Sequence, residues 1–159
     1  MSREKQVDMT ETDVVMSLTS PATEIGTRKA LARVMGRLAD QMSPERAGMV
    51  EIALAEVINN IVEHAYRGQV GGMIRLSARL GRAFLRFEIC DDGTPLPGGT
   101  LPPGRPADLS VPRGNLPEGG FGWLLIHSVA REVRYSRNGE ENQLVVVFDL
   151  GEARPKAQR

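Results

Sequence analysis

Apolar and polar residues alternate along several short stretches of the chain, a pattern typical of strands that bury one face. Five stretches share it: residues 14–19, 74–80, 85–89, 132–136 and 143–150. A tight turn at Gly81-Arg82 joins the second stretch to the third, and Asn138-Gly139 separates the last two. Both are turn signals between alternating runs. The pattern therefore predicts five strands, four of them paired in two hairpins.

Three longer stretches repeat apolar residues at helical spacing and predict helices at about 21–41, 44–66 and 121–130. Ser20-Pro21 and Ser43-Pro44 precede the first two, and each is interpreted as a serine cap followed by proline at the first helical position. Strands with one buried face need helices to cover it. The predicted fold is therefore α/β, a two-layer α+β sandwich.

Residues 94–118 differ from the rest of the chain because they hold seven of its ten prolines, interleaved with glycines. A segment this long without regular structure inside a compact domain is usually functional. We interpret it as a lid over a site. Residues 13–150 then form a single domain between a disordered N-terminus at 1–12 and a polar tail at 151–159.

The composition narrows the class of protein. The chain has 159 residues, with 20 Lys+Arg and 20 Asp+Glu, so its charge gives no reason to expect a nucleic-acid or anionic membrane partner. Cys90 is the single cysteine, which excludes an internal disulfide. No apolar run reaches the length of a membrane span, and no signal-peptide pattern follows Met1. We expect a cytoplasmic protein that contacts neither nucleic acid nor a membrane.

The second predicted helix carries an acidic and an amide side chain one turn apart. Glu56 and Asn60 lie on one helix face, and asparagine is a poor residue for the middle of a helix. The ordinary explanation is a solvated helix face, but this strip lacks the lysines and glutamines that usually fill such faces. The segment is suggestive of a site without defining one.

Two glycine-containing segments also suggest a site without defining one. Asp91 ends a predicted strand just before Gly93, where a carboxylate could accept a hydrogen bond from an exocyclic amine. Gly120 and Gly122 open a predicted helix, where free backbone amides can bind phosphate. The ordinary explanations are a strand-ending turn and a flexible loop.

Taken together, the order and spacing of these segments resemble the N, G1 and G2 boxes of the GHKL ATPases. The resemblance extends from about Val14 to Leu150 and implies a Bergerat-type ATP-binding fold with a mixed, mainly antiparallel sheet. Within that superfamily the chain resembles the bacterial anti-sigma-factor serine/threonine kinases. The helix that continues to His64-Ala65-Tyr66 and the segment Gly119–Ile126 carry this likeness.

The resemblance implies a role for each matching residue. Asn60 would hold the Mg²⁺ that bridges the phosphates of ATP, and Glu56 would be the base that deprotonates the attacking hydroxyl. Asp91 would bind the adenine amine. The other nucleotide contacts implied in this way are His64, Gly93, Leu96, Gly120 and Gly122.

Some positions depart from the family pattern. Pro95 stands where the G1 box usually has a second glycine, and Asn142 is a candidate to replace a threonine often found near the adenine. Arg105 and Arg113 are the cations of the lid, and both a contact with the terminal phosphate and a solvated position remain open for them. We interpret Trp123 as a packing residue.

The sequence thus predicts an anti-sigma factor that is also an ATP-dependent serine/threonine-protein kinase. The implied partners are a sigma factor, an anti-anti-sigma (STAS-type) protein as substrate, and a second copy of the chain in a homodimer through the first helix. One alternative is a nucleotide-binding regulatory module without significant kinase activity, against which Glu56 argues. Another is a histidine-kinase-like catalytic domain, although no helix pair with a phospho-acceptor histidine precedes the domain.

Overall fold

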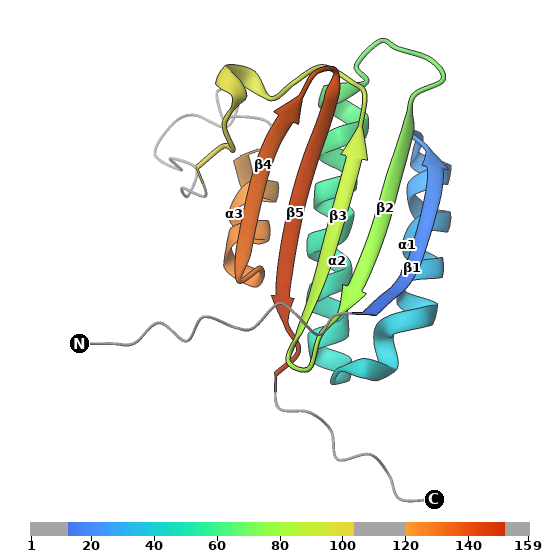
Figure 1. Ribbon diagram of the computed structural model, residues 1–159, viewed down its shortest axis with the longest axis vertical. Helices are drawn as coiled ribbons and strands as arrows, with labels where there is room; N and C mark the ends of the chain where they lie inside the picture. Colours follow the sequence, from blue (N-terminus) through green and yellow to red (C-terminus); the bar gives the residue numbers. More distant parts are fainter. Residues whose placement is uncertain (1–12, 104–119, 152–159) are drawn as a thin grey trace, which may run out of the picture.

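The computed structural model describes residues 13–103 and 120–151 of the chain, and Figure 1 shows their arrangement. The strands are β1 (Asp13–Pro21), β2 (Met73–Leu80), β3 (Phe84–Asp91), β4 (Glu132–Asn138) and β5 (Glu141–Asp149). The α-helices are α1 (Glu24–Leu38), α2 (Pro44–Asn60) and α3 (Gly120–Val129). Three short helical segments are η1 (Ala39–Gln41), η2 (Ile61–Ala65) and η3 (Pro97–Gly99).

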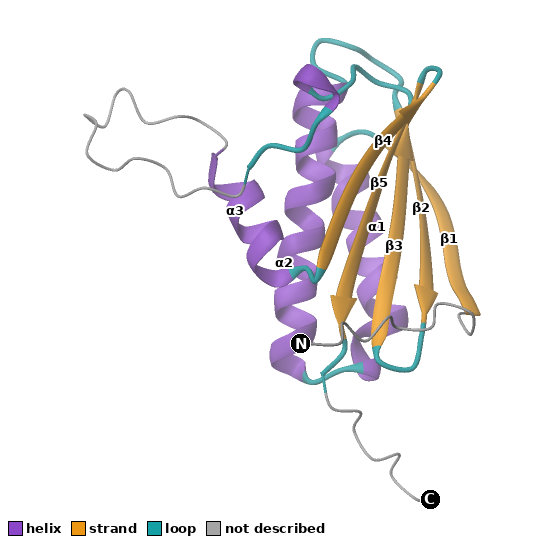
Figure 2. Ribbon diagram, turned by 60° about the vertical axis from the view of Figure 1, so that its left-hand side comes forward, coloured by secondary structure: helices purple, strands orange, loops and turns teal. Residues whose placement is uncertain are grey.

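The strands form one sheet in the order β1-β2-β3-β5-β4, and the three α-helices cover one face of it (Figure 2). The expected two-layer sandwich is confirmed, and so are both hairpins. Each of the four strand pairings is antiparallel, so the expected mixed character is absent from the described strands. Because β5 pairs with β3, the second hairpin extends the sheet and leaves β4 at its edge.

The core lies between the inner face of the sheet and α2. Phe87 of β3 and Phe148 of β5 are both fully buried, and their rings meet edge to face with centroids 5.9 Å apart. Helix α2 contributes the apolar stripe that the sequence indicated, including the fully buried Val50, Leu54 and Val57. Burial of these side chains fixes the rotation of α2 and therefore the side on which Glu56 and Asn60 lie.

The two expected helix starts have different outcomes. Ser43 caps α2 as expected, since its Oγ accepts a hydrogen bond from Arg46 N, and Pro44 is the first helical residue. The expected cap at Ser20-Pro21 is wrong. Pro21 is the last residue of β1, where it pairs with β2, and Thr23 caps α1 instead. Proline fits there because β1 is an edge strand with no further ladder to supply.

Helix α2 does not continue to residue 66 as a regular α-helix. After Asn60 the chain passes into the π-helical turn η2, and the amide of Tyr66 donates to the carbonyl oxygen of Ile61 at 3.3 Å. Such π turns within helices often occur at functional sites. The described residues contain no helix that is both long and apolar enough to cross a membrane.

The expected lid and chain ends are only partly covered. Residues 94–103 of the lid are described, and they include η3. The remainder of the lid, the expected N-terminus and the tail beyond Gly151 lie outside the described residues.

Candidate nucleotide-binding site

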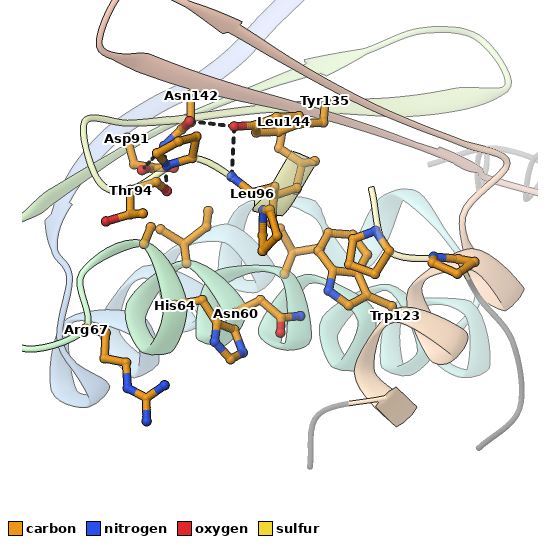
Figure 3. Close-up of a pocket in the computed structure, with 17 residues that line it drawn as sticks. Asn60, His64, Arg67, Asp91, Thr94, Leu96, Trp123, Tyr135, Asn142 and Leu144 are labelled. Carbon is orange, nitrogen blue, oxygen red and sulfur yellow. Dashed lines mark hydrogen bonds between the residues drawn. The ribbon is translucent and has the colours of Figure 1, made fainter. Parts of the chain in front are cut away.

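A pocket of about 490 Å³ lies between the end of α2, the start of the lid and the ends of β3, β4 and β5 (Figure 3). This volume is within the range of small-molecule sites. Its lining is Val57, Asn60, Ile61, His64, Ala65, Arg67, Asp91, Thr94, Pro95, Leu96, Pro97, Pro102, Pro103, Trp123, Tyr135, Asn142 and Leu144. The lining therefore brings together the helix, the strand end and the lid that the sequence singled out.

Asp91 lies at the end of β3 with a side chain that is only 3% exposed. Its Oδ1 accepts hydrogen bonds from the backbone amide of Gly93 and from Asn142 Nδ2, both at 2.9 Å. Among the described residues no donor reaches the second oxygen, Oδ2. Burial raises the pKa of Asp91, and the hydrogen bonds from Asn142 and Gly93 act in the opposite direction. The pocket thus contains a buried carboxylate with one oxygen committed and the other available to a ligand.

Gly93 is required for close approach of two segments. A Cβ at this position would lie 2.5 Å from the carbonyl oxygen of Ala65, inside van der Waals contact. The next residue, Thr94, donates its backbone amide to that same oxygen at 2.7 Å. The φ of Gly93 is not positive, so we attribute the glycine to packing of this turn against η2 and not to a left-handed turn.

Glu56, Asn60 and Gly122 are brought together where α3 packs on α2. A Cβ on Gly122 would lie 2.7 Å from Glu56 Oε2 and 3.5 Å from Asn60 Nδ2. Asn60 lines the pocket, whereas the half-buried Glu56 lies beside it and is not part of its lining. The missing side chain at Gly122 leaves room for the carboxylate and the amide at the start of α3.

The other expected contacts are distributed as follows. His64 is exposed at the rim of the pocket, and Leu96 lines it from the lid. Gly120 is the first residue of α3. Trp123 is buried as expected, but it also forms part of the pocket wall. The lid cations at positions 105 and 113 lie outside the described residues.

A hydrogen-bond network beneath the pocket carries no motif in the sequence. Asn142 Oδ1 accepts from the hydroxyl of Tyr135 and from Arg137 Nη1, each at 2.7 Å. The Tyr135 hydroxyl in turn accepts from the backbone amide of Leu96 at 3.1 Å. Tyr135 and Arg137 occupy alternate positions of β4 and reach Asn142 across the β4–β5 hairpin, so their common face was detectable from the period of two. The contact of Asn142 with Asp91 was not detectable in this way.

Comparison with known proteins agrees with this arrangement of segments. A family model described as the histidine kinase-like ATPase domain matches residues 19–148. The chain belongs to this family. The match includes every residue that lines the pocket.

Individual members of the family give more detail. The chain is 31% identical over 109 residues to the serine-protein kinase RsbW of Bacillus mycoides, an alignment that spans 68% of this chain and 64% of that relative. The RsbU and RsbW domains of Rv1364c from Mycobacterium tuberculosis superpose with a TM-score of 0.58 and 18% identity, over 92% of this chain and 34% of that one. A histidine kinase domain from Erythrobacter litoralis superposes with a TM-score of 0.50 and 18% identity, over 89% and 64%. The two superpositions show a shared fold.

The residues of this ATPase domain fit a nucleotide. Asp91 offers an acceptor to a base, and the pocket wall is largely apolar. Asn60 Nδ2 is buried without a hydrogen-bond partner among the described residues, as expected of an amide that awaits a ligand. Rotation of that amide by half a turn would present Oδ1 in its place.

The residues also fit Mg²⁺ that arrives with a nucleotide. No group of three or more His, Cys, Asp or Glu side chains that could hold a metal is present in the described part of the chain. Mg²⁺ commonly takes one or two protein ligands and receives the rest from substrate phosphates and water. Asn60, with Glu56 nearby, suits an ion carried in by a nucleotide better than a permanent metal centre.

Proposed function

We propose that this protein is an ATP-dependent serine/threonine-protein kinase that also acts as an anti-sigma factor. The observation that carries the proposal is the meeting of Asp91, Asn60 and Glu56 around one pocket in a histidine kinase-like ATPase domain. The likeness to a serine-protein kinase named RsbW favours a protein hydroxyl as the acceptor.

Each residue has a distinct task in this proposal. Asp91 binds the base through Oδ2, and Asn60 contributes an oxygen ligand to Mg²⁺, which neutralises phosphate charge when it is bound. Glu56 accepts the proton of the attacking serine or threonine hydroxyl. It lies beside the pocket and not within it, which suits a group that acts on an acceptor arriving from outside.

The lid supports the nucleotide from the opposite side. Leu96, Pro97, Pro102 and Pro103 line the pocket, so we propose that residues 94–118 close over the base and phosphates. Among the described residues that line the pocket, Arg67 is the one with a positively charged side chain. It is exposed, and it suits a contact with phosphate at the open rim. His64 and Gly120 complete the proposed contacts.

The partners follow from the kinase proposal. A sigma factor would be held by the protein, and an anti-anti-sigma protein of the STAS type would be the phosphorylated substrate, which places the protein in the cytoplasm. The charges on α1 oppose the expected homodimer through this helix. The exposed side of that helix carries Arg28, Lys29, Arg33 and Arg37. Arg28 pairs with Glu24, so a symmetric interface would bring the other three positive charges together. The kinase proposal does not depend on a dimer.

The test is incubation of the protein with labelled ATP, Mg²⁺ and candidate anti-anti-sigma proteins. Transfer of label to a serine or threonine of one candidate is the expected result. Binding of ATP with no transfer to any candidate would favour the nucleotide-binding regulatory module. Label on a histidine would favour the histidine-kinase-like alternative.

A further inference from the structure

Asn142 lies under the pocket with all of its hydrogen-bonding groups in use. Oδ1 accepts from Tyr135 and Arg137, while Nδ2 donates to Asp91 Oδ1 at 2.9 Å and to the carbonyl oxygen of Gly93 at 3.1 Å. The residue is 3% exposed. An amide has two donor hydrogens and one acceptor oxygen, so this one has no donor left for a ligand. Asn142 therefore acts through its neighbours, and not as a direct replacement for a base-contacting threonine.

The orientation of this amide is fixed by Arg137. A guanidinium group can only donate hydrogen bonds. Asn142 must therefore turn its oxygen towards Arg137, which places its nitrogen against Asp91 (Figure 3 shows the contact with Asp91). The Tyr135 hydroxyl reinforces this choice, because it accepts from Leu96 N and so directs its own proton to Asn142.

The orientation of Asp91 follows from that of Asn142. Asp91 Oδ1 receives two N–H donors, from Asn142 and from the backbone of Gly93, and rotation of the carboxylate would break both bonds. Oδ2 is thereby left as a fixed acceptor. An ionised carboxylate accepts hydrogen bonds but cannot donate them. It favours a purine with an amino group at C6 over one with a carbonyl oxygen there, whose lone pairs would face the carboxylate.

We propose that Asn142 is a positioning residue, oriented by Arg137 and Tyr135, that holds Asp91 so that the site selects 6-aminopurine over 6-oxopurine nucleotides. This inference rests on the proposed nucleotide site. It assigns base selectivity to a buried amide that has no hydrogen-bond donor left for the base.

The test compares ADP with IDP, which share ribose and phosphates and differ in the purine ring at C6 and N1. Affinities are measured in Mg²⁺ by calorimetry or by the fluorescence of Trp123, the single tryptophan of the chain and part of the pocket wall. The wild type is expected to prefer ADP. Asn142→Val should lower the ADP/IDP affinity ratio about tenfold, the equivalent of one charged hydrogen bond. Asn142→Thr, whose side chain has the shape of valine but keeps a hydroxyl donor for Asp91, should retain most of the preference.

Two further variants keep the comparison decisive. Gln143→Val is the matched control, because the neighbouring strand residue faces the other side of the sheet and should leave the ratio unchanged. If Asn142→Val does not fold, Tyr135→Phe removes a single hydroxyl from the network and should lower the ratio in the same direction.

The outcomes separate this inference from the proposed function. Equal weakening of ADP and IDP by Asn142→Val would assign Asn142 a purely structural role and overturn the inference. An unchanged ratio in Asn142→Val, or in Tyr135→Phe where that variant replaces it, would also overturn it. Wild-type binding of both nucleotides without preference would overturn the inference alone. Wild-type binding of neither would overturn the nucleotide site itself, and the inference with it.

Discussion

The hydroxyl of Tyr66 accepts a hydrogen bond from the backbone amide of Asp92 at 2.9 Å, which joins the end of η2 to the turn that carries Asp91. The same hydroxyl donates to the carbonyl oxygen of Met73 at 2.8 Å. Burial raises the pKa of Tyr66, so the hydroxyl keeps its proton near neutral pH. A single buried side chain thus links the end of η2, the start of β2 and the turn that follows Asp91.

Tyr66→Phe should destabilise the protein and weaken nucleotide binding together. The variant keeps the ring but leaves the amide of Asp92 and the carbonyl of Met73 without this partner. The free energy of unfolding should fall by about 1–3 kcal/mol, as measured by urea denaturation. ADP affinity should fall as well, because the turn beside Asp91 loosens. A variant with wild-type unfolding and wild-type ADP affinity would show that the hydroxyl is dispensable.

Gly93→Ala should destabilise the fold through overpacking. The added Cβ would meet the backbone oxygen of Ala65 at 2.5 Å, and backbone atoms of a packed helix end cannot easily move away. We expect a loss of about 1–3 kcal/mol in the free energy of unfolding. The control is Gly48→Ala in α2, where nothing lies within 4 Å of the new Cβ and helix propensity favours alanine. Equal stability of the two variants would contradict the argument.

Glu56→Gln should separate catalysis from binding. Glutamine preserves the shape of the side chain and removes the proton acceptor, and loss of a general base typically lowers the rate about 10²–10⁴-fold. Because Glu56 is not part of the pocket lining, ADP affinity should stay at the wild-type value. Phosphate transfer to the protein substrate and calorimetry with ADP measure the two effects. Transfer at the wild-type rate would place the base elsewhere.

Asn60→Ala should reduce the contribution of Mg²⁺ to nucleotide binding. Chelation of Mg²⁺ with EDTA is expected to weaken ADP binding by the wild type, because the ion would neutralise phosphate charge and the Asn60 amide would be one of its ligands under the proposal. In the variant, ADP affinity in Mg²⁺ should already be low and EDTA should change it less. The measurement is calorimetry with and without EDTA. An undiminished effect of EDTA in Asn60→Ala would remove this residue from the metal site.

The pH dependence of stability should report on Asp91. Burial raises its pKa above the ordinary value of 3.8, so the folded state holds the proton more tightly than the unfolded state does. The stability contributed by the protonated group is therefore present at low pH and is lost as the pH rises through the higher folded pKa. The measurement is the difference in free energy of unfolding between the wild type and Asp91→Asn. This difference should decrease as the pH rises above 3.8, by at most about 1.4 kcal/mol per pH unit. A difference that increases with pH over that range would mean that the hydrogen bonds to Asp91 outweigh its burial.

Most of the fold was predictable because its signals are local. The strands 74–80 and 85–89 and the helix at 121–130 were expected close to their observed bounds, since alternation and helical periodicity mark them directly. The start of α1 was not. Ser20-Pro21 has the local form of a helix cap, but pairing with Met73 keeps Pro21 in β1 and passes the cap to Thr23. Long-range pairing outweighed a short-range preference there.

The short motifs of the candidate site were predictable, but the side chains that hydrogen-bond to the motif residues were not. Asn60, Asp91 and Leu96 line one pocket, as the resemblance implied. The side chains of Tyr135 and Arg137, which hold Asn142, carried no motif that pointed to Asp91. Tyr135 and Arg137 reach Asn142 within the β4–β5 hairpin, but the contact of Asn142 with Asp91 depends on how two hairpins far apart in the chain meet.

The sequence by itself determined the order of the helices and strands, the amphipathic face of α2 and the positions of three glycine- and asparagine-containing segments. These are properties of residues within a few turns of one another, where periodicity and backbone preference act. Only the tertiary structure decided that β5 lies beside β3, with Asp91 opposite Asn142 and hydrogen-bonded to it. That arrangement depends on burial of the sheet against α2, because a shift of one residue in the register would turn Asn142 away from the pocket.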